Sequence, residues 1–204
     1  MKDVELYGIV LCGGKSSRMG TDKSLLNYHG IGQRYYLCEL LNQFCARTFI
    51  SCNANTPAPD GAAYNFIHDH PLYSGNGPIS GLVSAFSRFP TKNMLLIGCD
   101  YPFLEADHIS YFLSQIPADA IAAAFYNHHE NYYEPVLAWY SVTAGVMVRK
   151  YLNEGHTSLQ QFLVKINAYK VQASDTDMIR SVDTYDEYLS AIERLANKNK
   201  IFNA

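Results

Sequence analysis

Near its beginning the chain reads LYGIVLCGGKSSRMGTDK, residues 6–23. The first part of this segment, Leu6–Leu11, is an apolar run with the length of a buried β-strand. Adjacent glycines follow the run directly, and glycine lets a backbone turn tightly or approach a ligand closely. Ten of the thirteen glycines of the chain fall within residues 1–81. We therefore expect a strand that ends in a binding loop, and a functional site built largely by the first part of the chain.

Along the rest of the chain, apolar runs typical of strands alternate with segments whose apolar residues have helical spacing. Apolar runs predict strands at Thr48–Cys52, Asn65–His68, Met94–Gly98, Ile121–Phe125, Pro135–Tyr140 and Ala168–Gln172. Apolar residues at helical spacing predict helices at Leu37–Phe44, Ile79–Phe86, Ile109–Ile116, Thr143–Asn153, Leu159–Ile166 and Tyr185–Ile192. This alternation indicates an α/β fold with three α/β/α layers, in which helices cover both faces of a Rossmann-like, mainly parallel sheet. Ligands of such sheets bind at the carboxyl ends of the strands, which selects the loop after Leu11 and the turn at Asp100.

Composition narrows the class of protein. The chain has 204 residues, of which 48% are hydrophobic and 17% charged, so it is not a disordered, collagen-like or coiled-coil sequence. Sixteen Lys and Arg against nineteen Asp and Glu give a net charge of −3, which argues against a nucleic-acid partner. The apolar runs are too short for a membrane span and no signal peptide is evident, so we expect a cytoplasmic protein without a membrane partner. We expect one domain at residues 1–196 and a polar C-terminal tail at 197–204.

The glycine-rich loop has the composition of a phosphate site. Successive glycines let backbone N–H groups converge on phosphate oxygens, and Lys15, Arg18 and Lys23 place three cations within nine residues. The glycine spacing matches neither a Walker loop nor the dinucleotide fingerprint, which excludes a Walker ATPase and a standard nicotinamide enzyme. On these residues alone, an ordinary flexible surface loop remains an alternative to a phosphate-binding loop.

Asp100 follows a buried strand directly. A carboxylate at the carboxyl edge of a sheet is a natural ligand for Mg²⁺, which prefers hard oxygen donors together with phosphate and water. The alternative is an aspartate that caps the following turn.

The loop also carries a family resemblance. Leu11–Lys23 resembles the signature Leu-x-Gly-Gly-x-Ser-x-Arg-Met-Gly-x-Asp-Lys of the molybdenum cofactor guanylyltransferases, a family of the nucleotidyltransferase superfamily. Further matches follow in order: Ser51-Cys52-Asn53, Asp69, Gly77-Pro78-Ile79-Ser80-Gly81, Cys99-Asp100-Tyr101-Pro102-Phe103-Leu104 and Glu134-Pro135. The resemblance covers about residues 5 to 195 and implies a fold of the nucleotide-diphospho-sugar transferase type.

The resemblance implies a reaction and a set of site residues. The family transfers GMP from GTP to the phosphate of molybdopterin and releases pyrophosphate, with Mg²⁺ as cofactor. Such chemistry needs positioning and charge neutralisation more than covalent help from the protein. The implied catalytic residues are Lys23, Arg18 and Asp100, and the implied metal ligands are Asp100 and Asp183. The implied nucleotide-binding residues are Leu11, Cys12, Gly13, Gly14, Ser16, Lys23, Asn53, Asp69, Gly77, Pro78 and Asp100.

Asn53 and Asp69 are the candidates for recognising guanine. An aspartate accepts hydrogen bonds from the N1–H and 2-amino edge of guanine, which adenine lacks. Asn53 could equally be a strand-end turn residue. The chain departs from the family in the late Asn-x-Asn motif, which here reads Ser181-Val182-Asp183, so that Asp183 would offer a carboxylate in place of an amide.

Two other functions stay open at this point. One is a related nucleotidyltransferase that uses CTP or another acceptor, although Gly13-Gly14 and Asp22-Lys23 resemble the guanylyl branch more than the cytidylyl one. The other is a non-catalytic GTP-binding module that delivers the cofactor to other molybdenum cofactor biosynthesis proteins.

Overall fold

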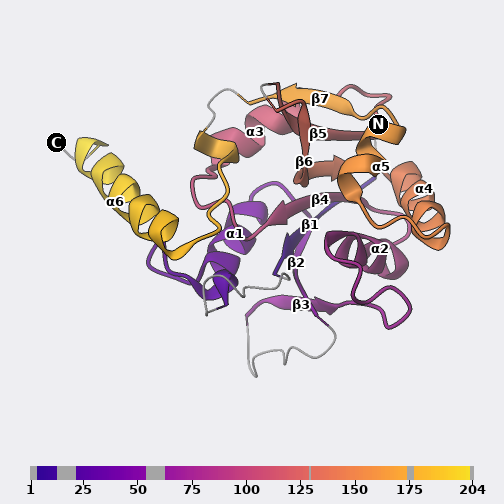
Figure 1. Ribbon diagram of the computed structural model, residues 1–204, viewed down its shortest axis with the longest axis horizontal. Helices are drawn as coiled ribbons and strands as arrows, with labels where there is room; N and C mark the ends of the chain where they lie inside the picture. Colours follow the sequence, from indigo (N-terminus) through magenta and orange to yellow (C-terminus); the bar gives the residue numbers. More distant parts are fainter. Residues whose placement is uncertain (1–3, 13–21, 54–62, 129, 174–176, 203–204) are drawn as a thin grey trace.

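The computed structural model describes residues 4–12, 22–53, 63–128, 130–173 and 177–202. Strands β1 (Leu6–Leu11), β2 (Arg47–Cys52), β3 (Asn65–His68), β4 (Asn93–Gly98), β5 (Ala122–Asn127), β6 (Tyr132–Tyr140) and β7 (Tyr169–Gln172) form one sheet. Their order is β3-β2-β1-β4-β6-β5-β7 (Figure 1). Within the described residues, β6 runs antiparallel to both of its neighbours and the other paired strands are parallel. The predicted mainly parallel α/β sheet is therefore confirmed.

Helices cover the two faces of this sheet. They are α1 (Gln33–Leu41), α2 (Pro78–Arg88), α3 (Ala106–Ser114), α4 (Val142–Asn153) and α5 (Leu159–Lys165). Helix α6 (Tyr185–Phe202) projects away from the sheet (Figure 1), and η1 (Lys23–Leu25) and η2 (Asp177–Ile179) are short 3₁₀ turns. Helices α2, α4 and α5 pack with Ile9 on one face, and α1 and α3 pack with Val10 on the other. The alternation of neighbouring strand residues between the two apolar cores confirms the three-layer arrangement.

Two predicted elements, the strand at Pro135–Tyr140 and the helix at Tyr185–Ile192, are longer in the structure. Strand β6 begins at Tyr132, ahead of the start predicted at Pro135, and its register with β5 shifts between Ala124 and Tyr126. Proline has no backbone N–H to give to a ladder, so an irregular pairing beside Pro135 is the expected way to accommodate it. Helix α6 runs to Phe202, past residue 196, so part of the segment expected as a tail is helical.

The five cysteines are free thiols, with Cys38, Cys45 and Cys52 buried. No helix in the described part of the chain combines the length and apolar character needed to span a membrane.

The order of the strands brings several strand ends to one edge. The chain passes from β1 to β2 and β3 on one side and then crosses to β4 on the other, which makes β1 the point where the strand order reverses. Leu11 lies opposite Ser51 of β2 and Gly98 of β4. The residues that follow these strands therefore meet at the carboxyl edge, where ligands of open α/β sheets bind.

Helices α2 and α4 approach each other closely at Gly145. A Cβ atom at Gly145 would lie 2.5 Å from the ring of Phe86 on α2. We expect Gly145→Val to lower the free energy of unfolding by about 1–3 kcal/mol, because overpacking moves the ring or the helix. Urea denaturation measures the change. Val146→Ala on the same helix is the control, because Val146 is 70% exposed. Equal midpoints for wild type and Gly145→Val would show that the two helices can separate at no cost.

Candidate functional site

A pocket of about 370 Å³ opens at the carboxyl ends of β1, β2 and β3. It contains several of the residues that the sequence analysis assigned to nucleotide binding, namely Leu11, Asn53, Asp69, Gly77 and Pro78. Ser51, Cys52, Ser74, Gly75 and Gly81 complete its described wall. Ser74 and Gly75 were missed in the sequence analysis, although the pair Gly75 and Gly77 was a visible signal of a tight turn.

The outer wall of this pocket is a turn folded back onto the start of α2. The Ser80 hydroxyl donates to the carbonyl of Tyr73 at 2.6 Å and accepts from the amide of Asn76 at 3.0 Å. Gly75 and Gly77 have φ values of +85° and +73°, which other residues adopt only with strain. The glycines thus allow the turn that places the N-terminus of α2, with its positive dipole, beside the pocket.

Asp69 directs an acidic group into the pocket from the end of β3. Its backbone amide donates to the carbonyl of Cys52 at 3.1 Å, which extends the β2–β3 ladder by one residue. The residue is only 9% exposed, and burial raises the pKa of its carboxyl group while the nearby His68 lowers it. A largely buried acceptor at this place can select a ligand with matching N–H donors.

Asp100 lies at the end of β4, in a space that depends on a glycine. A Cβ atom at Gly98 would collide with Asp100 Oδ1, so a larger residue would force this carboxylate to move. Burial raises the pKa of Asp100 to about 6; the charge of Asp183 adds to the rise, whereas a backbone hydrogen bond and Lys23 oppose it. A partly desolvated carboxylate beside another carboxylate and a lysine is a group that gains stability from a cation.

A segment close to the C-terminus completes this part of the site. Lys23 Nζ donates to Asp183 Oδ1 at 2.7 Å and to the carbonyl of Val182 at 3.3 Å. The amide of Val182 in turn donates to the carbonyl of Asp100 at 2.8 Å. Lys23, Asp100 and Asp183, which are far apart in the sequence, are therefore gathered into one group, which we call the charged cluster.

The start of α6 holds Asp183 in this position. The Glu187 carboxylate accepts from the amides of Asp183 at 2.7 Å and Thr184 at 2.9 Å, and the Thr184 hydroxyl accepts from the amide of Glu187 at 3.3 Å. This reciprocal arrangement is a capping box, in which Thr184 caps the start of α6. It also explains why the pKa of Glu187 is lowered, since the bonds favour the ionised carboxylate.

Another carboxylate lies near the charged cluster. The Tyr101 hydroxyl donates to Glu134 Oε2 at 2.9 Å, and burial raises the pKa of Glu134 while this hydrogen bond lowers it. The phenol of Tyr101 thus holds the Glu134 carboxylate in place. Glu134 was visible in the sequence only as part of a motif, and its pairing with Tyr101 was not predictable.

Part of the predicted site lies outside the described residues, namely Gly13, Gly14, Ser16 and Arg18. Cys12 is described and extends β1 by one residue, since its amide donates to the carbonyl of Ser51 at 3.0 Å. Among the described residues, no three His, Cys, Asp or Glu side chains are grouped closely enough to hold a metal by themselves. The two predicted metal ligands, Asp100 and Asp183, both belong to the charged cluster.

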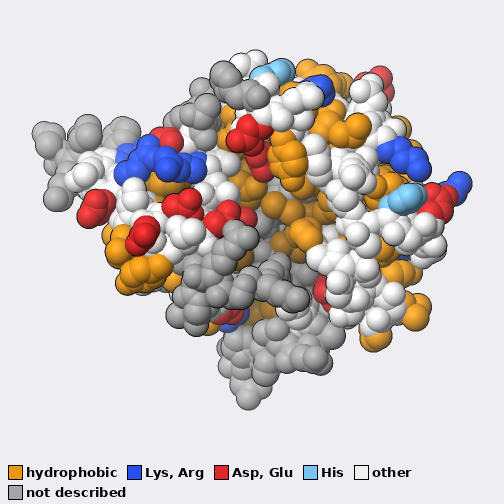
Figure 2. Space-filling view, viewed as in Figure 1, with side chains coloured by type: hydrophobic (Ala, Val, Ile, Leu, Met, Phe, Trp, Pro, Cys, Tyr) orange, Lys and Arg blue, Asp and Glu red, His pale blue; other side chains and the backbone are white. Residues whose placement is uncertain are grey.

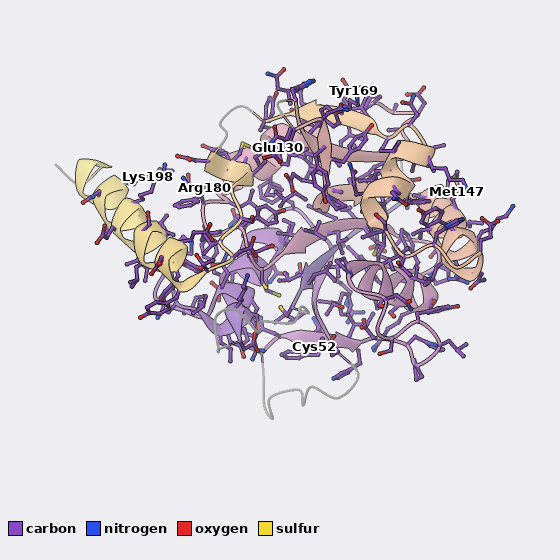
Figure 3. All side chains as sticks on the ribbon, viewed as in Figure 1. Cys52, Glu130, Met147, Tyr169, Arg180 and Lys198 are labelled. Atoms are coloured by element: carbon purple, nitrogen blue, oxygen red, sulfur yellow. The ribbon has the colours of Figure 1, made fainter. Side chains whose placement is uncertain are left out.

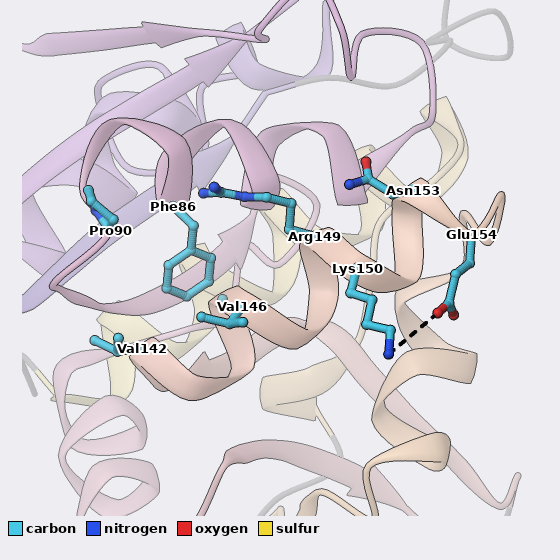
Figure 4. A pocket seen from close by; sticks show the side chains of 9 residues that line it. Phe86, Pro90, Val142, Val146, Arg149, Lys150, Asn153 and Glu154 are labelled. Atoms are coloured by element: carbon cyan, nitrogen blue, oxygen red, sulfur yellow. Dashed lines mark ion pairs between the residues drawn. The ribbon is translucent and has the colours of Figure 1, made fainter.

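A different hollow, between α2 and α4, lies away from these strand ends (Figure 4). Its described walls include Phe86, Val146 and Arg149, and none of the residues predicted for nucleotide, metal or catalysis lines it.

The burial of Asp100 has a measurable consequence for stability. The pKa of Asp100 in the folded chain, about 6, exceeds its ordinary value of 3.8, so the folded state binds the proton more tightly than the unfolded state. Wild type should therefore lose stability as pH rises from about 4 to about 6, by up to about 3 kcal/mol. We expect Asp100→Asn to escape this loss, so that it melts higher than wild type above pH 6 and the difference shrinks towards pH 4.

Melting curves recorded in EDTA between pH 4 and pH 8 test this expectation. Asp119→Asn, at an exposed position before β5, is the control and should follow wild type at every pH. A stability difference between wild type and Asp100→Asn that does not change with pH would contradict the raised pKa.

Comparison with known proteins identifies the family. The model of the MobA-like NTP transferase domain matches residues 8–169. A probable molybdenum cofactor guanylyltransferase of Nostoc sp. is 30% identical over 164 residues, which cover 78% of this chain and 76% of the relative. A probable molybdenum cofactor guanylyltransferase of Bacillus cereus is 26% identical over 199 residues, which cover 94% of this chain and 98% of the relative.

Other similarities concern a longer protein and a solved structure. A molybdenum cofactor biosynthesis bifunctional protein of Synechocystis sp. is 27% identical over 187 residues, but the match spans only 52% of that relative's length. The crystal structure of molybdopterin-guanine dinucleotide biosynthesis protein A from Archaeoglobus fulgidus superposes with a TM-score of 0.77 at 21% identity, covering 94% of this chain and 99% of that one. The structural likeness supports the predicted fold type. By its sequence and the extent of the family match, the chain belongs to the MobA-like NTP transferase domain family and is a nucleotidyltransferase.

Proposed function

We propose that this nucleotidyltransferase of molybdenum cofactor biosynthesis transfers GMP from GTP to the terminal phosphate of molybdopterin, in the cytoplasm. An oxygen of the acceptor phosphate attacks the α-phosphorus of GTP. A new P–O–P linkage forms between the acceptor phosphate and the α-phosphorus. The bond from the α-phosphorus to the oxygen that bridges the α- and β-phosphates of GTP breaks, and pyrophosphate leaves with the electron pair. The support from relatives is the name guanylyltransferase carried by the Nostoc and Bacillus proteins.

The observation that carries the proposal is the charged cluster beside the pocket. Lys23 is 17% exposed and lies between the backbone of Val182 and the carboxylate of Asp183. Its ammonium group can neutralise phosphate charge that grows on the leaving group during transfer. The pocket at β1, β2 and β3 accommodates the base of the nucleotide, and its end at Leu11 leads to the strand edge where the charged cluster lies.

Asp69 and Asn53 are the proposed guanine-recognising residues of that pocket. The Asp69 carboxylate accepts from the N1–H and 2-amino groups of guanine, and a base without these donors leaves the buried acceptor unpaired. This preference favours GTP over CTP and ATP.

The residues of the charged cluster suit a magnesium ion. Asp100 and Asp183 offer hard carboxylate oxygens, and the absence of a side chain at Gly98 leaves space for the Asp100 carboxylate. A bound Mg²⁺ would be held by these two side chains and would supply charge neutralisation for the phosphates. Lys23, already paired with Asp183, supplies the protein's own positive charge at the same place.

Pyrophosphate release tests the proposed reaction. With GTP, Mg²⁺ and molybdopterin present, we expect turnover by wild type and a decrease of about 100- to 1,000-fold in Lys23→Ala, because one positioned cation is lost. Lys165→Ala removes a lysine that pairs with Glu154 on the helical layer, and should leave turnover unchanged. Absence of acceptor-dependent pyrophosphate release by folded wild type would refute the proposal.

Base selection is tested separately with GTP and inosine triphosphate, which lacks the 2-amino group. Calorimetry should give wild type a clear preference for GTP, because Asp69 loses one donor with inosine triphosphate. Asp69→Asn should weaken GTP binding by about 10- to 100-fold and narrow the gap between the two nucleotides, since a charged hydrogen-bond acceptor is removed. Asp119→Asn is the matched control. An unchanged preference in Asp69→Asn would assign guanine recognition to other residues.

A further inference from the structure

Three tyrosines form a cluster next to the charged cluster. Tyr28 lies between η1 and α1, whereas Tyr185 and Tyr188 lie at the beginning of α6. The rings of Tyr28 and Tyr188 meet edge to face with centroids 5.1 Å apart, and the rings of Tyr185 and Tyr188 lie 5.9 Å apart. We call these residues the tyrosine cluster. Nothing in the proposed reaction so far uses it.

The position of the tyrosine cluster relates it to the reacting phosphates. Tyr185 follows Asp183 by two residues, and the Asp183 carboxylate accepts a hydrogen bond from Lys23. Burial raises the pKa of the Tyr28 phenol above its ordinary range, and the charges of Asp100 and Glu187 add to the rise, so the phenol lies within electrostatic reach of Asp100. The tyrosine cluster is therefore adjacent to the charged cluster.

No residue of the tyrosine cluster lines the nucleotide pocket. The pocket is built against α2, whereas two of the tyrosines belong to α6, and these helices lie on opposite sides of the view in Figure 1. A nucleotide base in the pocket and a flat group on the tyrosines would thus approach the charged cluster from different directions. This is the arrangement that a transfer between two bulky substrates requires.

The exposure of the rings also favours binding. Tyr185 is 55% exposed although it touches Tyr188, and the next apolar residue of the helix, Leu189, is 45% exposed. Figure 2 shows hydrophobic side chains gathered near the end where α6 begins, next to acidic ones. Single exposed aromatic residues are common on protein surfaces. A connected group of three rings beside a phosphate-transfer centre is a surface on which a planar ring can stack.

We propose that the tyrosine cluster, Tyr28, Tyr185 and Tyr188, binds the planar pyrimidinone ring of the acceptor by stacking, while the acceptor phosphate reaches Lys23. This inference rests on the proposed function, which makes the acceptor a pterin phosphate. A pterin has a flat π face, and the short arm between ring and phosphate keeps the ring near the reacting atoms. Stacking on tyrosine gives affinity with little entropy cost, because the aromatic side chains are already held by one another.

Binding of a fluorescent pterin tests the inference without turnover. The probe is the phosphate ester of 6-hydroxymethylpterin. Its fluorescence is quenched when the ring stacks on tyrosine. The titration uses the full chain with Mg²⁺. We expect quenching by wild type and a Kd about tenfold or more higher for Tyr185→Leu and Tyr28→Leu, in line with the loss of a stacking partner. Tyr28→Phe keeps the ring and should stay within about twofold of wild type.

Tyr169→Leu is the matched control. Tyr169 is 44% exposed on β7, at the far side of the sheet from Cys52, and its loss should leave pterin binding unchanged (Figure 3). Melting curves with and without GTP accompany each variant. They show whether the chain is folded and whether the nucleotide pocket still works.

The outcomes separate this inference from the proposed function. Equal pterin affinity in wild type, Tyr28→Leu and Tyr185→Leu overturns the inference, as does an absence of pterin binding to wild type that still binds GTP. If Tyr185→Leu weakens GTP and leaves the pterin unaffected, the tyrosine cluster serves the nucleotide and the inference is wrong. If pterin binding depends on the tyrosines while pyrophosphate release is absent, the tyrosine cluster stands and the proposed reaction fails.

Discussion

The hydrogen bonds that continue past the ends of β1, β3 and β4 determine how the site is built. The amide of Cys12 reaches the carbonyl of Ser51, the amide of Cys99 reaches the carbonyl of Leu11, and the amide of Asp69 reaches the carbonyl of Cys52. These bonds keep the parallel strands in register up to their last residues. The pocket and the Asp100 turn consequently share one rigid edge, which suits a reaction that depends on positioning.

The segment at Val182 and Asp183 adds hydrogen bonds and a carboxylate that the sheet alone does not provide. Val182 is bonded through its amide to Asp100 and through its carbonyl to Lys23, and Asp183 pairs with the same lysine. Asp183 is 52% exposed, so its ion pair contributes at most about 1 kcal/mol to stability. We infer that the value of this contact is electrostatic: it gathers opposite charges at the place where phosphate charge must be neutralised.

Much of the fold followed from the sequence because the strands at the site are buried and end in residues with visible chemistry. The strand ending at Leu11 and the turn at Asp100 could be predicted from apolar runs and from the residues that follow them. The direction of β6 could not, because an apolar run has the same appearance in a parallel and an antiparallel strand. The pairing of Tyr101 with Glu134 and the meeting of Tyr28 with Tyr188 were equally hidden, since they join residues from separate elements. The roles of Lys23, Asp69, Asp100 and Asp183 remain predictions that their positions support.

The fate of the α-phosphate of GTP tests the central claim most directly. GTP labelled at the α-phosphate and GTP labelled at the γ-phosphate are incubated separately with the protein, Mg²⁺ and molybdopterin, and the label is followed into the pterin product. Guanylyl transfer predicts that the α label enters the pterin product, whereas the γ label leaves entirely as pyrophosphate. Entry of the γ label into the pterin, or retention of both labels in unreacted GTP by folded protein, would contradict the account.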